Sequence, residues 1–305
     1  MNRLTAQGDL LTGARQTMLS WVKVIEAFDD LPDDYKATVQ DLLADEQKFP
    51  YTILAPPING SRFPLAEKLV FWISETLYIL ERNGKQIKTV RHPKPLIGYL
   101  EMGGILLYSW FTVSGVTTEG GIAASTVVYN TATHRHIQPF INEIRSLPAE
   151  DVGAQDAPPE FQYLEPLSYK FFNFACNSLR GDEKIIHSVW QPEISRNIFP
   201  VFRRTFKRLI APAHLAILTD KEIIFIEDDL RSVDTRGKRY GGIWRYICLD
   251  SILAVTFIDC SNGDLKLSFH IRPDTTFERI LGGAARPQAM KLKSELEVIL
   301  NEHGV

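Results

Sequence analysis

Cysteine is scarce in this chain. The three cysteines, Cys176, Cys248 and Cys260, lie far apart, and none belongs to a Cys-x-x-Cys pair. Their odd number and their spacing argue against a disulfide framework and offer no set of zinc ligands. We therefore expect three reduced thiols that pack as small apolar side chains in a cytoplasmic protein.

Long hydrophobic runs are also missing. The longest strongly apolar stretch, Ile105 to Val113, is about half of the roughly 20 residues that a membrane-spanning helix needs, and it contains Ser109 and Thr112. The first residues lack the apolar block of a secretory signal, and Asp9 follows soon after them. The sequence thus predicts a protein that stays in the cytoplasm and has no membrane span.

Recognisable catalytic and metal-binding motifs are absent too. The sequence has no nucleophile elbow, no phosphate-cradling glycine loop, no His-Glu-x-x-His helix and no paired carboxylates on one predicted element. His134 and His136 lie two residues apart at the edge of a predicted helix, without a cysteine or carboxylate at ligand spacing. We therefore expect a protein that is not an enzyme and that has neither a metal site nor a cofactor.

What the chain does have is an ordinary globular composition. Its 305 residues favour two domains, and its formal net charge of -3 gives no reason to expect nucleic acid as a partner.

Residues 1–48 predict a helical hairpin. From Ala14 to Phe28, apolar residues recur at steps of three and four, which places them on one face of a helix. A second helix is expected after Pro32, because proline and the two acids that follow it suit a helix start.

Residues 49–147 predict a first β domain. Short runs rich in β-branched and aromatic residues alternate with glycine and proline clusters, as in consecutive antiparallel strands. Asn83-Gly84 is a strong signal for a tight hairpin turn. The expected strands, followed by a helix over Pro139 to Ser146, are Tyr51 to Ala55, Lys68 to Ser74, Leu77 to Arg82, Lys85 to Arg91, Leu96 to Met102, Leu106 to Ser114 and Ile122 to Tyr129.

Residues 148–162 are rich in proline and lack periodicity, which predicts a linker. A second β domain is expected over residues 163–305, with a preceding helix at Leu167 to Leu179 and a closing helix from Pro287 to His303. A last strand between Pro273 and Gly283 is poorly marked. The better marked strands are Lys184 to Trp190, Leu215 to Thr219, Ile223 to Glu227, Ile243 to Leu249, Ile252 to Ile258 and Leu265 to Ile271.

The two halves show a weak internal repeat. Leu69 to Glu81 corresponds to Leu215 to Glu227, since each reads as a strand, a polar turn and a strand. The alternation from Leu107 to Val113 recurs from Leu265 to Ile271, and each strand series ends in an amphipathic helix. Gene duplication and convergence on half-buried strands both explain this similarity.

Three segments carry a resemblance to a known family. They are Ile105 to Trp110, His214 to Ile224 and Tyr240 to Ile247, and in them the chain resembles the pleckstrin-homology-like (PH-like) domains of bacteria. The resemblance covers about Phe49 to Gly304. It implies an α+β, mainly β, fold of two split barrels, each capped by its C-terminal helix and together preceded by the helical hairpin.

A basic segment is the strongest candidate site. Arg196 to Arg208 contains five cations and no acid, and a helix beginning near Pro200 would place aromatic residues on one side and basic residues on the other. The basic side would consist of Arg203, Arg204, Lys207 and Arg208. A later loop adds Arg231, Arg236, Lys238 and Arg239, which could face the same end of the barrel.

Two interpretations of these cations remain open. Arginine matches phosphate oxygens geometrically, and the resemblance implies a loop that holds phosphoinositide head groups. Alternatively, the cations are solvated and neutralised by the nearby acids Glu227, Asp228, Asp229 and Asp234.

The leading functional hypothesis is a non-enzymatic binding or scaffolding module that recognises a protein segment, either as an added strand at a barrel edge or beside a C-terminal helix. The alternative is peripheral binding to anionic lipid or phosphate through the basic loop. The sequence leaves the ligand and the oligomeric state open.

Overall fold

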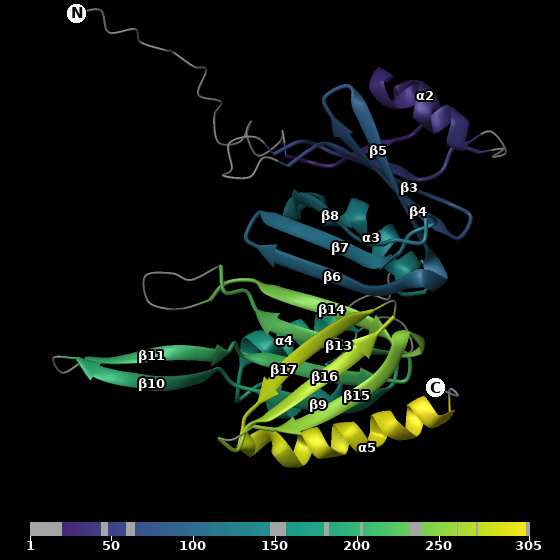
Figure 1. The fold of residues 1–305 in the computed structure, drawn as a ribbon. Helices are drawn as coiled ribbons and strands as arrows, with labels where there is room; N and C mark the ends of the chain where they lie inside the picture. The colour runs from purple at the N-terminus through teal and green to yellow at the C-terminus, as the bar shows by residue number, and fades with distance from the viewer. Residues whose placement is uncertain are drawn as a thin grey trace, which may run out of the picture.

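Antiparallel strands are the commonest secondary structure in the computed structural model, and the helices lie at the ends and faces of the sheets (Figure 1). The structure describes residues 20–43, 48–58, 65–146, 157–179, 183–201, 204–231, 239–260, 262–272 and 274–302. In the described residues, none of the helices combines the length and the apolar character that crossing a bilayer requires.

A five-stranded antiparallel sheet forms the first part of the chain, in the order β1-β2-β3-β4-β5. Gly84 has a φ of 65° at the turn between β4 and β5, a conformation that glycine adopts without strain, so the predicted Asn83-Gly84 hairpin is confirmed. The strands are β1 (Lys23–Ile25), β2 (Thr52–Ala55), β3 (Lys68–Ile73), β4 (Thr76–Asn83) and β5 (Gln86–Pro93).

The N-terminal helical hairpin is not confirmed. Its second helix is present as α2 (Asp33–Leu42), whose Tyr35 and Val39 are buried against the sheet. Where the first helix was predicted, Lys23–Ile25 is strand β1, paired with β2, and a 3-10 turn, η1 (Phe28–Asp30), follows. Val22 and Val24, two residues apart, both face the core, as alternate residues of a strand do. The β-branched residues and the free edge of β2 therefore favoured a strand over the helix that the spacing of apolar residues predicted. Ala14 lies outside the described residues.

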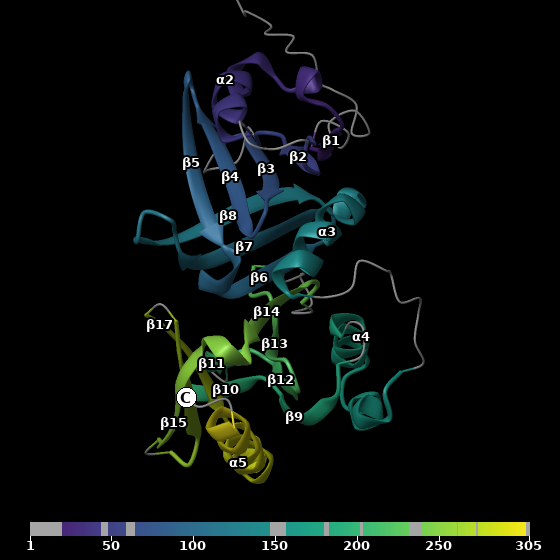
Figure 2. The same cartoon turned by 90° about the vertical axis from the view of Figure 1, so that its right-hand side faces the viewer.

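A seven-stranded sheet connects the two halves of the chain, in the order β8-β7-β6-β14-β13-β12-β9. In both views β6 of the first half lies next to β14 of the second half (Figures 1 and 2). The two halves are therefore joined by backbone hydrogen bonds, whereas the sequence predicted only a linker. The strands are β6 (Ile97–Ile105), β7 (Tyr108–Val116), β8 (Ile122–Asn130), β9 (Ile185–Gln191), β12 (His214–Thr219), β13 (Glu222–Asp228) and β14 (Gly242–Cys248).

A three-stranded sheet and a long helix complete the second half. The sheet order is β15 (Ile252–Asp259), β16 (Leu265–Ile271) and β17 (Thr275–Leu281). β17 is the strand that the sequence marked poorly. Helix α5 (Arg286–Glu302) buries four apolar residues against the second-half core, namely Ala289, Leu292, Leu296 and Leu300.

Two further helices flank the junction of the halves. Helix α3 (His134–Ile144) follows a 3-10 turn, η3 (Thr131–Thr133), that the side chain of Asn130 caps, so it begins before the predicted start at Pro139. Helix α4 (Tyr169–Ser178) follows η4 (Pro159–Leu164). The remaining 3-10 turns are η2 (Lys94–Leu96), η5 (Leu249–Ser251) and η6 (Gly283–Ala285).

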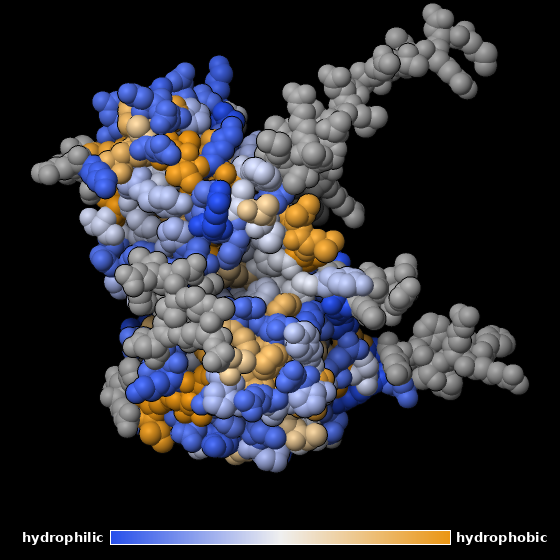
Figure 3. All heavy atoms as spheres, turned by 180° about the vertical axis from the view of Figure 1, so that it is seen from behind, coloured by the Kyte–Doolittle hydropathy of each residue, from blue (hydrophilic) through white to orange (hydrophobic). Residues whose placement is uncertain are grey.

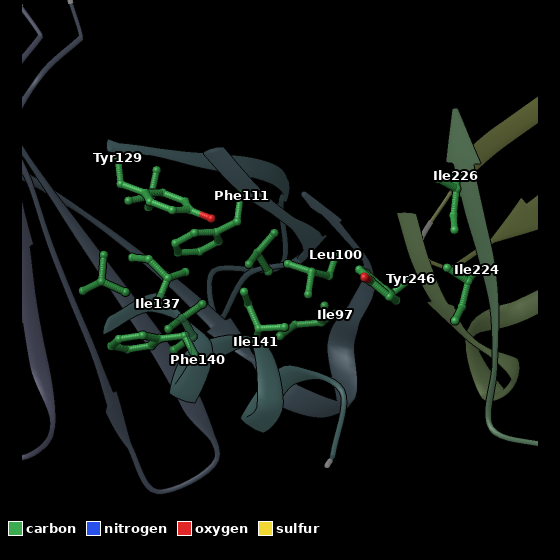
Figure 4. Close-up of a cluster of buried hydrophobic side chains, with 14 of the residues drawn as sticks. Ile97, Leu100, Phe111, Tyr129, Ile137, Phe140, Ile141, Ile224, Ile226 and Tyr246 are labelled. Atoms are coloured by element: carbon green, nitrogen blue, oxygen red, sulfur yellow. The ribbon is translucent and has the colours of Figure 1, made fainter. Parts of the chain in front are cut away.

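The largest apolar core extends through both halves. Figure 4 shows Phe140 and Ile141 of α3 near Phe111 of β7, with Tyr246 of β14 beyond them. The same cluster includes Phe171 of α4. Burial of these side chains thus links the halves at the same place as the strand pairing, and α3 covers the first-half side of this core.

Candidate functional site

The predicted basic helix is wrong. Residues Ile194–Val201 form strand β10 and Arg204–Ala211 form strand β11, an antiparallel hairpin that projects from the body (Figure 1). Its register places Arg196 opposite Arg208 and Pro200 opposite Thr205. The segment is rich in β-branched and aromatic residues, which favour strands, and a two-stranded ribbon tolerates a proline because both of its strands are edges.

Only part of the predicted set of cations lies within the described part of the chain. Arg204, Lys207 and Arg208 lie on β11, and Arg208 is exposed. Arg239 adjoins the start of β14, where its Nη1 lies 2.6 Å from a Glu193 oxygen and 3.9 Å from an Asp228 oxygen. Arg203, Arg236 and Lys238 lie outside the described residues, so the full anion site stays a prediction.

Carboxylates neutralise Arg231 and Arg196, as they do Arg239. Arg231 binds Asp229 through two nitrogens, at 3.0 and 2.8 Å, and its guanidinium lies 4.2 Å from the ring centroid of Trp110. Burial raises the pKa of Asp229, but the hydrogen bonds from Arg231 outweigh burial and lower it. Arg196 likewise pairs with Asp264. These contacts agree with the interpretation in which acids balance the basic loops.

The outer edge of β15 is a second candidate site, and the sequence analysis did not single it out. β15 pairs with β16 on one side, and the sheet order places no described strand on its other side. The six residues from Leu253 to Ile258 contain no charge and no proline. An open edge of this composition is a ready template for pairing with another chain.

The other outer strands of the three- and five-stranded sheets carry charges that protect their edges. β1 has Lys23, β5 has Lys88 and Arg91, and β17 has Glu278. On β15, by contrast, the side chains of Leu253 and Ile258 are 44% and 50% exposed. Among these four edges β15 is therefore the one best suited to strand addition.

Helix α5 runs beside this edge and fixes its position. Lys293 Nζ lies 5.4 Å from the ring centroid of Phe257, and Arg286 forms an ion pair with Asp259 at the end of β15. The hydrogen bond from Arg286 lowers the pKa of the Asp259 carboxyl, which keeps this pair charged. The site thus consists of an uncharged strand edge bounded by a helix with basic side chains.

The chain offers an internal comparison for this edge. β6 is the first strand after η2 in the first half, and β15 is the first strand after η5 in the second half. The outer edge of β6 is occupied by β14 over five residue pairs from Leu100↔Tyr246 to Gly104↔Gly242. The corresponding edge of β15 has no such partner among the described strands.

The chain matches no protein-family model and no curated protein sequence. The functional argument therefore depends on the arrangement of its own residues.

Proposed function

We propose that this chain is a non-enzymatic binding module with two PH-like halves, and that its second half binds an extended segment of a partner protein as an added strand along β15, beside α5. The order of elements supports the PH-like part. Strands β2 to β5, strands β6 to β8 and helix α3 follow one another in the first half. β9, β12 to β14, β15 to β17 and α5 follow in the second half.

The contrast between β6 and β15 is the observation that carries this proposal. In the first half, an outer edge at this position accepts a strand, β14, from elsewhere in the chain. In the second half, the equivalent edge is apolar and open. Strand addition satisfies the unpaired backbone groups of the edge, and alternate side chains supply specificity.

The chemistry of β15 also indicates the partner. Ala254, Thr256 and Ile258 are exposed, and cross-strand pairs of β-branched and aromatic residues stabilise antiparallel sheets. A matching segment is therefore extended, uncharged in its centre and rich in valine, isoleucine, threonine or aromatic residues.

A single lysine on this edge is expected to weaken binding while leaving the fold intact. Peptides that bind the wild-type protein can be selected from a random display library. These peptides should bind the Thr256→Lys variant at least about ten-fold more weakly, a loss of ~1.4 kcal/mol in binding free energy. The reason is that a lysine on a strand edge opposes the addition of another strand. The matched control is Thr276→Lys, which places the same charge at an exposed position on the opposite edge of the same sheet. Fluorescence anisotropy with labelled peptide measures both variants.

Methylation of the peptide backbone tests the mode of binding. Strand addition requires that N-methylation of one alternate set of peptide amides removes binding while methylation of the other set is tolerated. Peptides that bind Thr256→Lys as well as wild type, or that tolerate methylation at every position, would refute strand addition at β15.

Anionic membrane binding is the second candidate, favoured by a hairpin that projects clear of the body with Arg196 opposite Arg208. The wild-type protein should sediment with vesicles containing anionic lipid, less so as salt increases, and not with neutral vesicles. Replacing Arg203, Arg204, Lys207 and Arg208 by glutamate should remove this binding. Equal absence of sedimentation with both vesicle types would eliminate the candidate.

A further inference from the structure

A cleft of about 470 Å³ lies at the junction of the two halves, away from β15. Its lining comes from the turn between β6 and β7, from α3, from α4 and from the start of β14. Figure 3 shows a recess at the waist of the molecule, with hydrophobic side chains beside it. The volume is in the range of sites for small molecules.

Aromatic and apolar side chains form most of the walls. Trp244 and Phe174 lie with ring centroids 4.6 Å apart, and Tyr246, Met102 and Ile141 add further apolar surface. Flat aromatic walls bind flat rings well, because dispersion contacts and offset stacking both add to the hydrophobic effect.

In the part of the cleft that the structure describes, no acidic or basic side chain is left uncompensated. Arg145 is the only Lys, Arg, Asp or Glu among the lining residues that the structure describes, and its side chain is 3% exposed. Its guanidinium bonds Glu222 and also lies 3.3 Å from a Glu183 oxygen. Two carboxylates thus already share this cation, so an anionic ligand would gain little attraction and would lose its hydration.

Hydrogen-bonding groups lie along one side of the cleft in a directional chain. The Gln138 amide donates to Asn142, so its oxygen faces His134 Nε2 at 3.0 Å, and that nitrogen carries the hydrogen. His134 Nδ1 then accepts from the Tyr129 hydroxyl at 2.9 Å. Burial raises the pKa of Tyr129, which keeps this phenol protonated. In this arrangement the phenol oxygen can accept one hydrogen bond from a donor on a ligand.

The rim of the cleft holds an unusual backbone conformation. Leu106 has a φ of 54° in the turn between β6 and β7, and its side chain is 79% exposed. Glycine or asparagine would adopt this conformation with less strain. A strained, exposed leucine beside an apolar cleft is typical of a functional position.

We propose that the cleft binds an uncharged aromatic molecule that carries a hydrogen-bond donor, independently of the strand-binding edge of β15. The aromatic rings of the ligand lie against Phe174, Trp244 and Tyr246. The ligand's donor reaches the hydroxyl oxygen of Tyr129, and Leu106 covers the ligand from the rim.

Two matched dyes test whether the cleft prefers an uncharged ligand to an anionic one, using the full-length protein. N-phenyl-1-naphthylamine is neutral and has one N–H donor, while 1-anilinonaphthalene-8-sulfonate has the same rings and a negative charge. The neutral dye should bind saturably at one site and at least about ten-fold more tightly than the sulfonate. Dye fluorescence and quenching of tryptophan emission report binding.

Two variants test the location of that site. Asn177→Trp fills the mouth of the cleft from α4 and should weaken the neutral dye at least about ten-fold, whereas Gln162→Trp, an equally exposed position outside the lining, should bind it like wild type. Leu106→Gly removes the rim side chain and relieves the left-handed strain. It should lose dye affinity with no decrease in the thermal midpoint, which separates binding from folding.

Equal binding of both dyes, undiminished binding to Asn177→Trp and Leu106→Gly, or no saturable binding of the neutral dye would each overturn the proposal. Peptide binding at β15 should be unchanged in Asn177→Trp, so the two sites can fail separately.

Discussion

Replacing Arg145 by methionine is expected to lower the free energy of unfolding by about 3–5 kcal/mol, since it leaves two carboxylates buried without their cation. Arg145 ends the first half and reaches into the second, where it bonds Glu222, Glu183 and the Ser178 carbonyl. Its guanidinium also lies 4.0 Å from the ring centroid of Tyr246. Urea unfolding followed by circular dichroism measures the loss.

The control for this substitution lies in the first turn of α3, the helix that ends just before Arg145. Arg135 is exposed, so Arg135→Met should change the free energy of unfolding by no more than about 0.5 kcal/mol. Adding Glu222→Gln to Arg145→Met removes one of the two orphaned charges and should recover part of the loss. An Arg145→Met protein within about 1 kcal/mol of wild type would show that the buried ion pairs contribute little.

Acidification is expected to destabilise the protein well above the range in which carboxylates titrate. Burial lowers the pKa of both His92 and His214 from 6.5 to about 4. Between these values the unfolded chain binds more protons than the folded chain, so stability falls as pH falls from about 6.5 toward about 4. At pH 5 the loss relative to pH 7.5 is about 2 kcal/mol for each histidine.

Glutamine at these two positions tests the source of the pH dependence. His92 contacts the Ser125 hydroxyl at 2.9 Å, and His214 Nδ1 donates to the Pro212 carbonyl at 2.9 Å, so an amide can replace one hydrogen bond at each site. The double variant should lose most of the difference in unfolding free energy between pH 7.5 and pH 5. An equally steep fall in the double variant would assign the acid sensitivity to other groups.

The spacing of apolar residues correctly predicted those strands and helices in which it follows one period clearly. β16 and α5 were expected to within one residue at each end, because alternation or helical spacing is strong there and the flanking turns are marked. β1 and β11 were misassigned as helices, because in short amphipathic segments the same apolar residues fit both periods. The PH-like resemblance remains a prediction, since the element order supports it but the sheets are not closed barrels.

The candidate sites were harder to predict, because they depend on which strands pair. Nothing local to Leu100 or Tyr246 indicates that β6 and β14 are neighbours, so the cleft beside them could not be anticipated. The edge of β15 did have a sequence signal, the uncharged run from Leu253 to Ile258, but its meaning depends on the sheet order. For Arg239, the acids named beforehand included Asp228, at 3.9 Å, but not Glu193, whose oxygen lies closer, at 2.6 Å.

The pairing of β6 with β14 also determines how this chain can be divided. A cut between residues 146 and 157 would leave each fragment with a bare strand and an uncovered apolar surface, because the backbone groups and core residues of each half have their partners in the other. We therefore expect that neither half folds as an independent domain. If the halves arose from one ancestral module, that pairing ended their independence, and they must now be made, folded and degraded together.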